Sequence, residues 1–138
     1  MKQLIKNLLE PKPALCFAIV YTLFILIFSL INLKDIPTPK FGNSDKLMHF
    51  VAYFGLTLLW YLYFFSRKLW RTVKLRSLVV ICLLIIAFGI FIEVLQNELT
   101  TYRTIDSLDV LANSIGVSIA FFVILSLKNP LKKVKSRL

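Results

Sequence analysis

Residues 100–116 read TTYRTIDSLDVLANSIG and carry polar side chains into the last of four hydrophobic segments. On a helix, with about 100° between successive residues, Asp106, Asp109, Asn113, Gly116 and Ala120 fall within roughly 80° of one another. A carboxylate inside a membrane helix costs about 2.5 kcal/mol or more unless it has a partner, so such residues usually face a helix bundle or an aqueous cavity. We therefore expect the other helices to supply partners for this polar face.

The hydrophobic content of the chain indicates a polytopic membrane protein. Of the 138 residues, 58% are hydrophobic and the mean hydropathy is +0.77, whereas a soluble domain is about half apolar at most. The excess lies at about residues 14–33, 47–65, 77–96 and 108–127, and each segment is long enough to cross the hydrocarbon core of a bilayer. The sequence predicts an all-α fold, a bundle of four transmembrane helices that forms one domain over residues 1–138.

The distribution of basic residues predicts the orientation of this bundle. The net charge is +10, and 13 of the 17 Lys and Arg residues lie in residues 1–13, 67–76 and 128–137, which flank the hydrophobic segments. Because basic loops remain in the cytoplasm, both termini and the central loop are predicted to be cytoplasmic, and the other two loops to face outward. The basic residues are expected to contact anionic membrane lipids, and no nucleic acid partner is predicted.

Several kinds of site lack support in the sequence. Cys16 and Cys82 give neither a disulfide framework nor a metal-ligand spacing, and we interpret both as small apolar side chains. There is no glycine-rich phosphate loop, and no serine or cysteine has a matching base. The carboxylate-rich pattern with one histidine lacks zinc-type spacing, so no metal ligand is assigned, although oxygen ligands are compatible with a divalent cation as cofactor.

Polar residues of the second and third segments are predicted to lie at the same depth as residues 106–113. Asp45, His49 and Tyr53 are spaced i, i+4 and i+8 at the start of the second segment, so they share one helix face. Glu93 and Gln96 lie near the outer end of the third segment. The predicted topology places all of these groups at the outer mouth of the bundle.

These motifs, in this order, resemble the VanZ-like family, which is named for a protein linked to teicoplanin resistance. They read D-K-x-x-H-F-x-x-Y at residues 45–53, G-x-x-x-E-x-x-Q at 89–96 and R-x-x-D-x-x-D-x-x-x-N-x-x-G at 103–116. The resemblance covers roughly residues 15–127. It implies a multi-pass protein of the bacterial cytoplasmic membrane that is associated with the cell envelope and with glycopeptide susceptibility, and it implies no particular substrate.

The candidate site residues fall into two groups. The predicted catalytic residues, which can move protons or stabilise charge, are His49, Glu93, Asp106 and Asp109. The predicted substrate-binding residues are Lys46, Tyr53, Gln96, Arg103 and Asn113.

Each candidate also has a structural interpretation. The two aspartates can cap a helix start, the lone histidine can be a hydrogen-bonded structural group, the lysine can extend its head group to the membrane surface, and the tyrosine can be an interfacial aromatic residue. Glu93 has no helix end to cap, and we expect it to be paired with a cation.

Three functional hypotheses follow. The first is an outward-facing pocket that binds or processes a lipid-linked or anionic head-group-bearing molecule, such as a lipid-linked envelope precursor, with Lys46 and Arg103 holding its phosphate or carboxylate. The second is a small intramembrane hydrolase or transferase that uses acid–base or divalent-metal chemistry. The third is a structural module in which the polar residues only lock the helices together.

Overall fold

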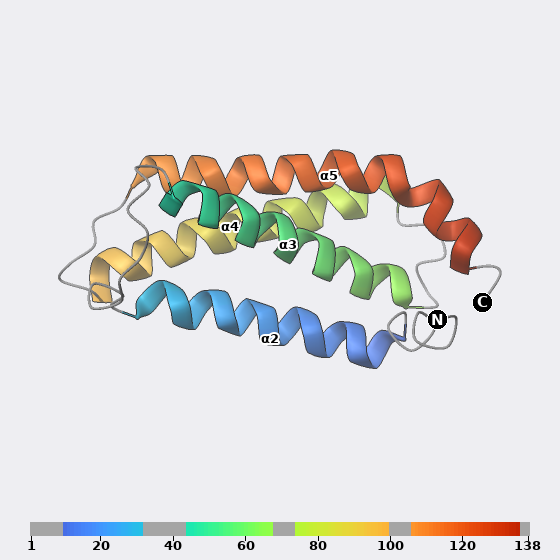
Figure 1. Ribbon diagram of the computed structural model, residues 1–138, viewed down its shortest axis with the longest axis horizontal. Coiled ribbons are helices and arrows are strands. Elements are labelled where there is room, and N and C mark those ends of the chain that lie inside the picture. Colours follow the sequence, from blue (N-terminus) through green and yellow to red (C-terminus); the bar gives the residue numbers. More distant parts are fainter. Residues whose placement is uncertain (1–9, 32–43, 68–73, 100–105, 136–138) are drawn as a thin grey trace.

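The computed structural model describes residues 10–31, 44–67, 74–99 and 106–135, which form four α-helices (Figure 1). These are α2 (Pro11–Leu30), α3 (Ser44–Ser66), α4 (Leu75–Leu99) and α5 (Ser107–Lys135). Each is long and apolar enough to cross a membrane. The predicted all-α class and the four predicted spans are therefore confirmed.

Helix α2 begins earlier than the span expected at about residues 14–33. Pro11 and Pro13 lie in its first turn, where a proline is accepted because the amides there have no intrahelical partner. The buried residues of α2 are only Ala14, Ala18 and Ile25. Most of the remaining surface of α2 is apolar and exposed, as expected for a helix that faces lipid.

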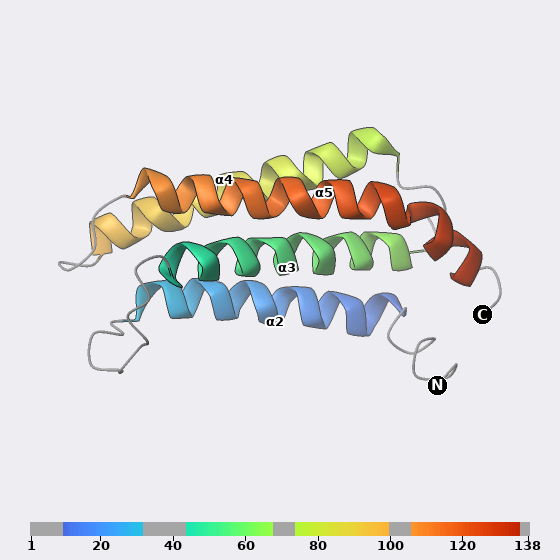
Figure 2. The ribbon, with the colours of Figure 1, turned by 45° about the horizontal axis from the view of Figure 1, so that its top comes forward.

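Helix α3 is the centre of the bundle. It contacts α2, α4 and α5, and its contact with α5 is the most extensive. Both views show α2 and α5 on opposite sides of α3 (Figures 1 and 2). Tyr53, Leu56 and Thr57 of α3 are almost completely buried. Helix α3 therefore supplies the middle of the core, and α2 packs outside the contact between α3 and α5.

Two glycines allow close helix packing near the polar residues. A Cβ atom added at Gly116 of α5 would meet the backbone carbonyl of Phe50 and lie 3.1 Å from the backbone nitrogen of Phe54 on α3. A Cβ atom added at Gly89 of α4 would lie 2.9 Å from a ring carbon of Tyr53. Small residues of this kind let membrane helices approach at the backbone. Here Gly116 brings α5 against the backbone of α3, and Gly89 brings α4 against Tyr53 of α3 and Asn113 of α5.

Replacing Gly116 by Ala should destabilise the bundle, because the new methyl group would meet backbone atoms of α3 that cannot rotate away. Overpacking of this kind costs about 1–3 kcal/mol. Gly55→Ala is the matched control, since its Cβ would lie 3.1 Å from the hydroxyl at the movable end of Tyr21. Thermal unfolding in detergent should give a lower midpoint for Gly116→Ala than for Gly55→Ala, and equal midpoints would contradict the close approach.

Candidate functional site

Polar side chains from three helices meet at one end of the bundle. The starts of α3 and α5 lie beside the end of α4 (Figure 1), because consecutive helices run in opposite directions. We call the following group the polar cluster: Asp45, Lys46 and His49 of α3, Glu93 of α4, and Asp106, Asp109 and Asn113 at the start of α5. Glu93, Asp109 and Asn113 are buried, so the cluster extends from the bundle surface into its interior.

Lys46 connects α3 to the start of α5. Its Nζ donates to Asp106 Oδ2 at 2.9 Å and to Asp109 Oδ1 at 3.1 Å. The two acceptors differ in environment, since the side chain of Asp106 is 42% exposed and that of Asp109 only 8%. Asp106 Oδ1 also accepts a hydrogen bond from the backbone N–H of Leu108 at 2.8 Å, so Asp106 caps α5 as well as binding Lys46.

The hydrogen bond from Lys46 lowers the pKa of the Asp106 carboxyl below its ordinary value, and the bond from the Leu108 backbone acts in the same direction. A lowered pKa means that the folded protein favours the ionised form. The stabilisation from this group is therefore fully present at neutral pH and is lost only as the pH falls through the lowered pKa. The contact between Lys46 and Asp106 is thus an ion pair at physiological pH.

The ring of His49 lies between α4 and α5. Its Nδ1 is 3.1 Å from Asn113 Oδ1 and 4.0 Å from Glu93 Oε1, and its Nε2 is 3.6 Å from Asp109 Oδ2. Because an amide oxygen only accepts hydrogen bonds, the contact with Asn113 requires a proton on Nδ1. In the neutral ring, the Nε2 lone pair would then face a carboxylate oxygen. A proton or another cation between these two acceptors is favourable, which suits His49 and Asp109 to proton transfer or to sharing a cation.

Two buried donors lie near Gly89, in the interior of the bundle. Tyr53 and Asn113 both adjoin Gly89, whose added Cβ would lie 3.2 Å from Asn113 Nδ2. The Tyr53 hydroxyl and Asn113 Nδ2 have no hydrogen-bond partner within the described part of the chain. A buried polar group without a partner costs about 1–3 kcal/mol, so both donors are available to water or to a ligand atom that enters the cluster.

Three side chains of the cluster are placed to hold a cation. Asp45, His49 and Asp109 each offer one ligand atom, and these atoms lie within 4.8 Å of one another. Two carboxylate oxygens and one imidazole nitrogen suit Mg²⁺ or Mn²⁺. The ammonium of Lys46 already binds the other oxygen of Asp109, so a divalent ion here would share that carboxylate with Lys46.

The remaining candidates lie elsewhere. The amide of Gln96 is directed to α2, where Nε2 donates to the backbone oxygen of Ser29 at 2.8 Å. Arg103 lies outside the described residues, so its predicted role stays a prediction. Asp45 was not among the candidate site residues, although its i, i+4 spacing with His49 was a signal for it. Both cysteines are free, Cys16 exposed and Cys82 buried.

The different burial of the two aspartates gives a testable energetic difference. In double-mutant cycles, Lys46→Met should couple more strongly to Asp109→Asn than to Asp106→Asn, because Asp109 is shielded from water and Asp106 is not. The three single and two double variants can be compared by thermal unfolding in detergent. Equal coupling to both aspartates would contradict the arrangement described here.

Comparison with known proteins identifies the family of the chain. The profile of the VanZ/LLP1 family matches residues 6–128. An uncharacterised protein of Schizosaccharomyces pombe is 37% identical over 120 residues, which cover 86% of this chain and 68% of the yeast protein. No solved structure matches the chain. With the described residues of the three motifs assembled at one end of a four-helix membrane bundle and the family profile extending over nearly all of the sequence, the chain belongs to the VanZ/LLP1 family.

Proposed function

We propose that the protein binds the head group of a lipid or lipid-linked molecule at the polar cluster. The observation that carries this proposal is the meeting of α3 and α5 at Asp109, whose carboxylate lies 3.1 Å from Lys46 Nζ and 3.6 Å from His49 Nε2, with Glu93 of α4 4.0 Å from the other nitrogen of His49. The cluster lies at the ends of predicted spans, which is the depth at which lipid head groups meet a membrane protein. Polar residues at this depth that face a bundle interior are typical of functional sites.

The charge of the cluster defines how an anionic head group would bind. Among the described residues, Lys46 binds two carboxylates of the cluster, Asp106 and Asp109, and Asp45 adds a third carboxylate that is exposed. A phosphate alone would be repelled by this excess of negative charge. A divalent cation on Asp45, His49 and Asp109 would offset the repulsion and bridge to the phosphate. Lys46, whose side chain is 32% exposed, would then exchange Asp106 for a phosphate oxygen.

Lipid binding tests this proposal. The purified protein should bind a long-chain lipid phosphate in the presence of Mg²⁺ and at least tenfold more weakly in EDTA, as measured by native mass spectrometry. Asp109→Asn removes the negative charge and leaves the side-chain volume almost unchanged. This variant should lose lipid binding. Glu98→Gln is the matched control, since Glu98 is an exposed carboxylate near the end of α4 and outside the cluster.

Two results would contradict the proposal. One is the absence of lipid binding by the wild-type protein with Mg²⁺, and the other is equal binding by wild type and Asp109→Asn. If EDTA does not affect lipid binding, the proposed head-group site is supported and the proposed divalent cation is contradicted.

A second candidate function is hydrolysis or group transfer on the same lipid. The geometry that favours it is the 3.6 Å approach of His49 Nε2 to Asp109 Oδ2, since a carboxylate beside an imidazole can orient the ring for proton transfer. Release of inorganic phosphate in the binding assay, abolished by His49→Gln, would identify an enzyme. Stable binding without product would identify a binding protein.

We also propose that the cluster faces outward, on the basis of the basic residues that flank the other helix ends, and that the membrane is the bacterial cytoplasmic membrane, on the basis of the resemblance to the VanZ-like family. In that orientation the site meets lipid-linked envelope precursors, which would connect it to glycopeptide susceptibility. A reporter fused after Leu138 should be cytoplasmic and one inserted at residues 34–44 external. The reversed pattern would place the cluster on the cytoplasmic side and exclude this connection.

A further inference from the structure

We infer that Asn113 positions His49 so that Nε2, and not Nδ1, is the imidazole nitrogen that binds the proposed cation. The inference rests on the proposed function, which places a divalent cation on Asp45, His49 and Asp109. It adds the atom of His49 that binds the ion and the residue that determines this choice. Asn113 acts through His49, so it is a positioning residue and not a ligand.

Helix α5 places one side chain beside each ring nitrogen of His49. Asn113 follows Asp109 by four residues, so the two share one face of α5. Asn113 Oδ1 is 3.1 Å from His49 Nδ1, and Asp109 Oδ2 is 3.6 Å from His49 Nε2. The ring of His49 is therefore oriented by two successive turns of α5.

The contact with Asn113 decides which ring nitrogen can bind a cation. An amide oxygen only accepts hydrogen bonds, so Nδ1 of His49 carries the hydrogen and has no lone pair for a metal ion. The Glu93 carboxylate lies on the same side, with Oε1 4.0 Å from Nδ1, and also favours the polarised N–H there. Metal-binding histidines commonly donate their second N–H to an oxygen in this way, which orients the ring.

The principal alternative is a cation bound to Nδ1. Its other neighbours would be Glu93 and Asn113, and each of these residues is only 2% exposed. Because Mg²⁺ usually keeps several water ligands, buried surroundings of this kind suit it poorly. On the Nε2 side, Asp45 is exposed, so water can complete the coordination of an ion there.

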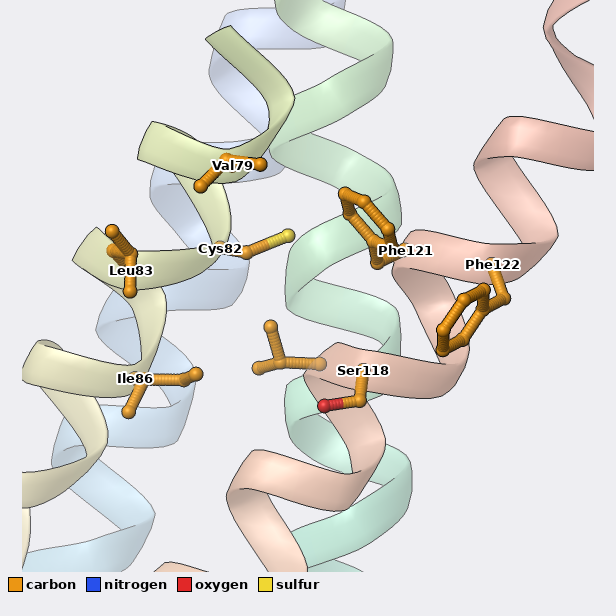
Figure 3. A pocket seen from close by; sticks show the side chains of 8 residues that line it. Val79, Cys82, Leu83, Ile86, Ser118, Phe121 and Phe122 are labelled. Atoms are coloured by element: carbon orange, nitrogen blue, oxygen red, sulfur yellow. The ribbon is translucent and has the colours of Figure 1, made fainter. Parts of the chain in front are cut away.

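The groove between α4 and α5 gives no competing cation site. It lies further along both helices from the polar cluster, and Figure 3 shows Cys82 of α4 directed toward Phe121 of α5. Its volume is about 240 Å³, and its lining residues carry neither a carboxylate nor an imidazole. The groove therefore lacks the carboxylate oxygens that Mg²⁺ prefers.

Gly89 of α4 restricts the movement of Asn113. A Cβ atom added at Gly89 would lie 3.2 Å from Asn113 Nδ2 and 2.9 Å from a ring carbon of Tyr53, which is itself only 1% exposed. The backbone of α4 thus packs against the amide whose oxygen contacts His49. This packing explains why a glycine is required one turn before Glu93 on α4.

The position of the ring hydrogen tests the inference in the wild-type protein. With ¹⁵N-labelled histidine, two-bond couplings between nitrogen and the ring hydrogens identify which nitrogen of His49 is protonated. At saturating Mg²⁺ without lipid, we expect the hydrogen on Nδ1 and the cation-induced shift at Nε2. A hydrogen on Nε2 with the shift at Nδ1 would overturn the inference and place the ion beside Glu93.

Two substitutions separate positioning from packing. Asn113→Leu removes the acceptor at similar size and should weaken Mn²⁺ binding about 10–100-fold, the usual effect of losing such a partner, as measured by electron paramagnetic resonance. Asn113→Asp keeps an acceptor oxygen, so it should keep the hydrogen on Nδ1 and bind Mn²⁺ at least as tightly as wild type. Asn97→Asp is the matched control for the added charge, since Asn97 is exposed on α4 outside the cluster, and it should leave the histidine spectrum unchanged.

The same measurements distinguish this inference from the proposed function. If wild type binds Mn²⁺ and Asn113→Leu binds it equally well, only the positioning role is excluded, and a lower unfolding midpoint for Asn113→Leu would then identify a packing role. A hydrogen on Nε2 in Asn113→Asp would also overturn the inference. If wild type binds no Mn²⁺, the proposed cation is contradicted and the positioning role is excluded with it.

Discussion

The buried carboxylate of Asp109 is the constraint on which the rest of the structure depends. It lies in the first turn of α5, largely shielded from water, where an unpaired negative charge would be strongly unfavourable. Its partners, Lys46 and His49, both come from the first two turns of α3. Because Asp109 must contact both side chains, the rotation of α5 about its axis and its position along α3 are fixed. The extensive contact between α3 and α5 then follows, with Gly116 allowing the backbones to approach one turn below Asn113.

The charge balance distinguishes a ligand site from a structural polar belt. A belt that only locks helices together needs paired charges, and surplus buried charge would weaken it. Among the described residues, Lys46 pairs with two carboxylates, those of Asp106 and Asp109, and Asp45 and Asp106 remain accessible to solvent. The buried Tyr53 hydroxyl and Asn113 amide add two donors. These accessible carboxylates and buried donors are the features on which the proposed cation and head-group site rests.

The sequence predicted the spans and the polar stripes well because both depend on local periodicity. Segment length and hydropathy located the four helices, and the i, i+4 spacing of Asp45 and His49 indicated the face of α3 that meets α5. The partner of Gln96 could not be predicted, because it is a backbone oxygen of α2, and α2 is apolar all round with no distinctive face. The start of α2 was placed too late because the hydrophobic segment begins at about residue 14, whereas the helix begins at Pro11 and accepts prolines in its first turn.

The central claim, that the polar cluster receives a head group, is tested most directly at His49. It is the only histidine of the chain, so selective ¹⁵N-histidine labelling gives one imidazole ring in a nuclear magnetic resonance spectrum of the protein in vesicles. With Nδ1 held by Asn113, addition of Mg²⁺ and a long-chain lipid phosphate should shift the Nε2 resonance markedly and the Nδ1 resonance little. If both resonances remain unchanged at saturating lipid, the cluster is not the head-group site.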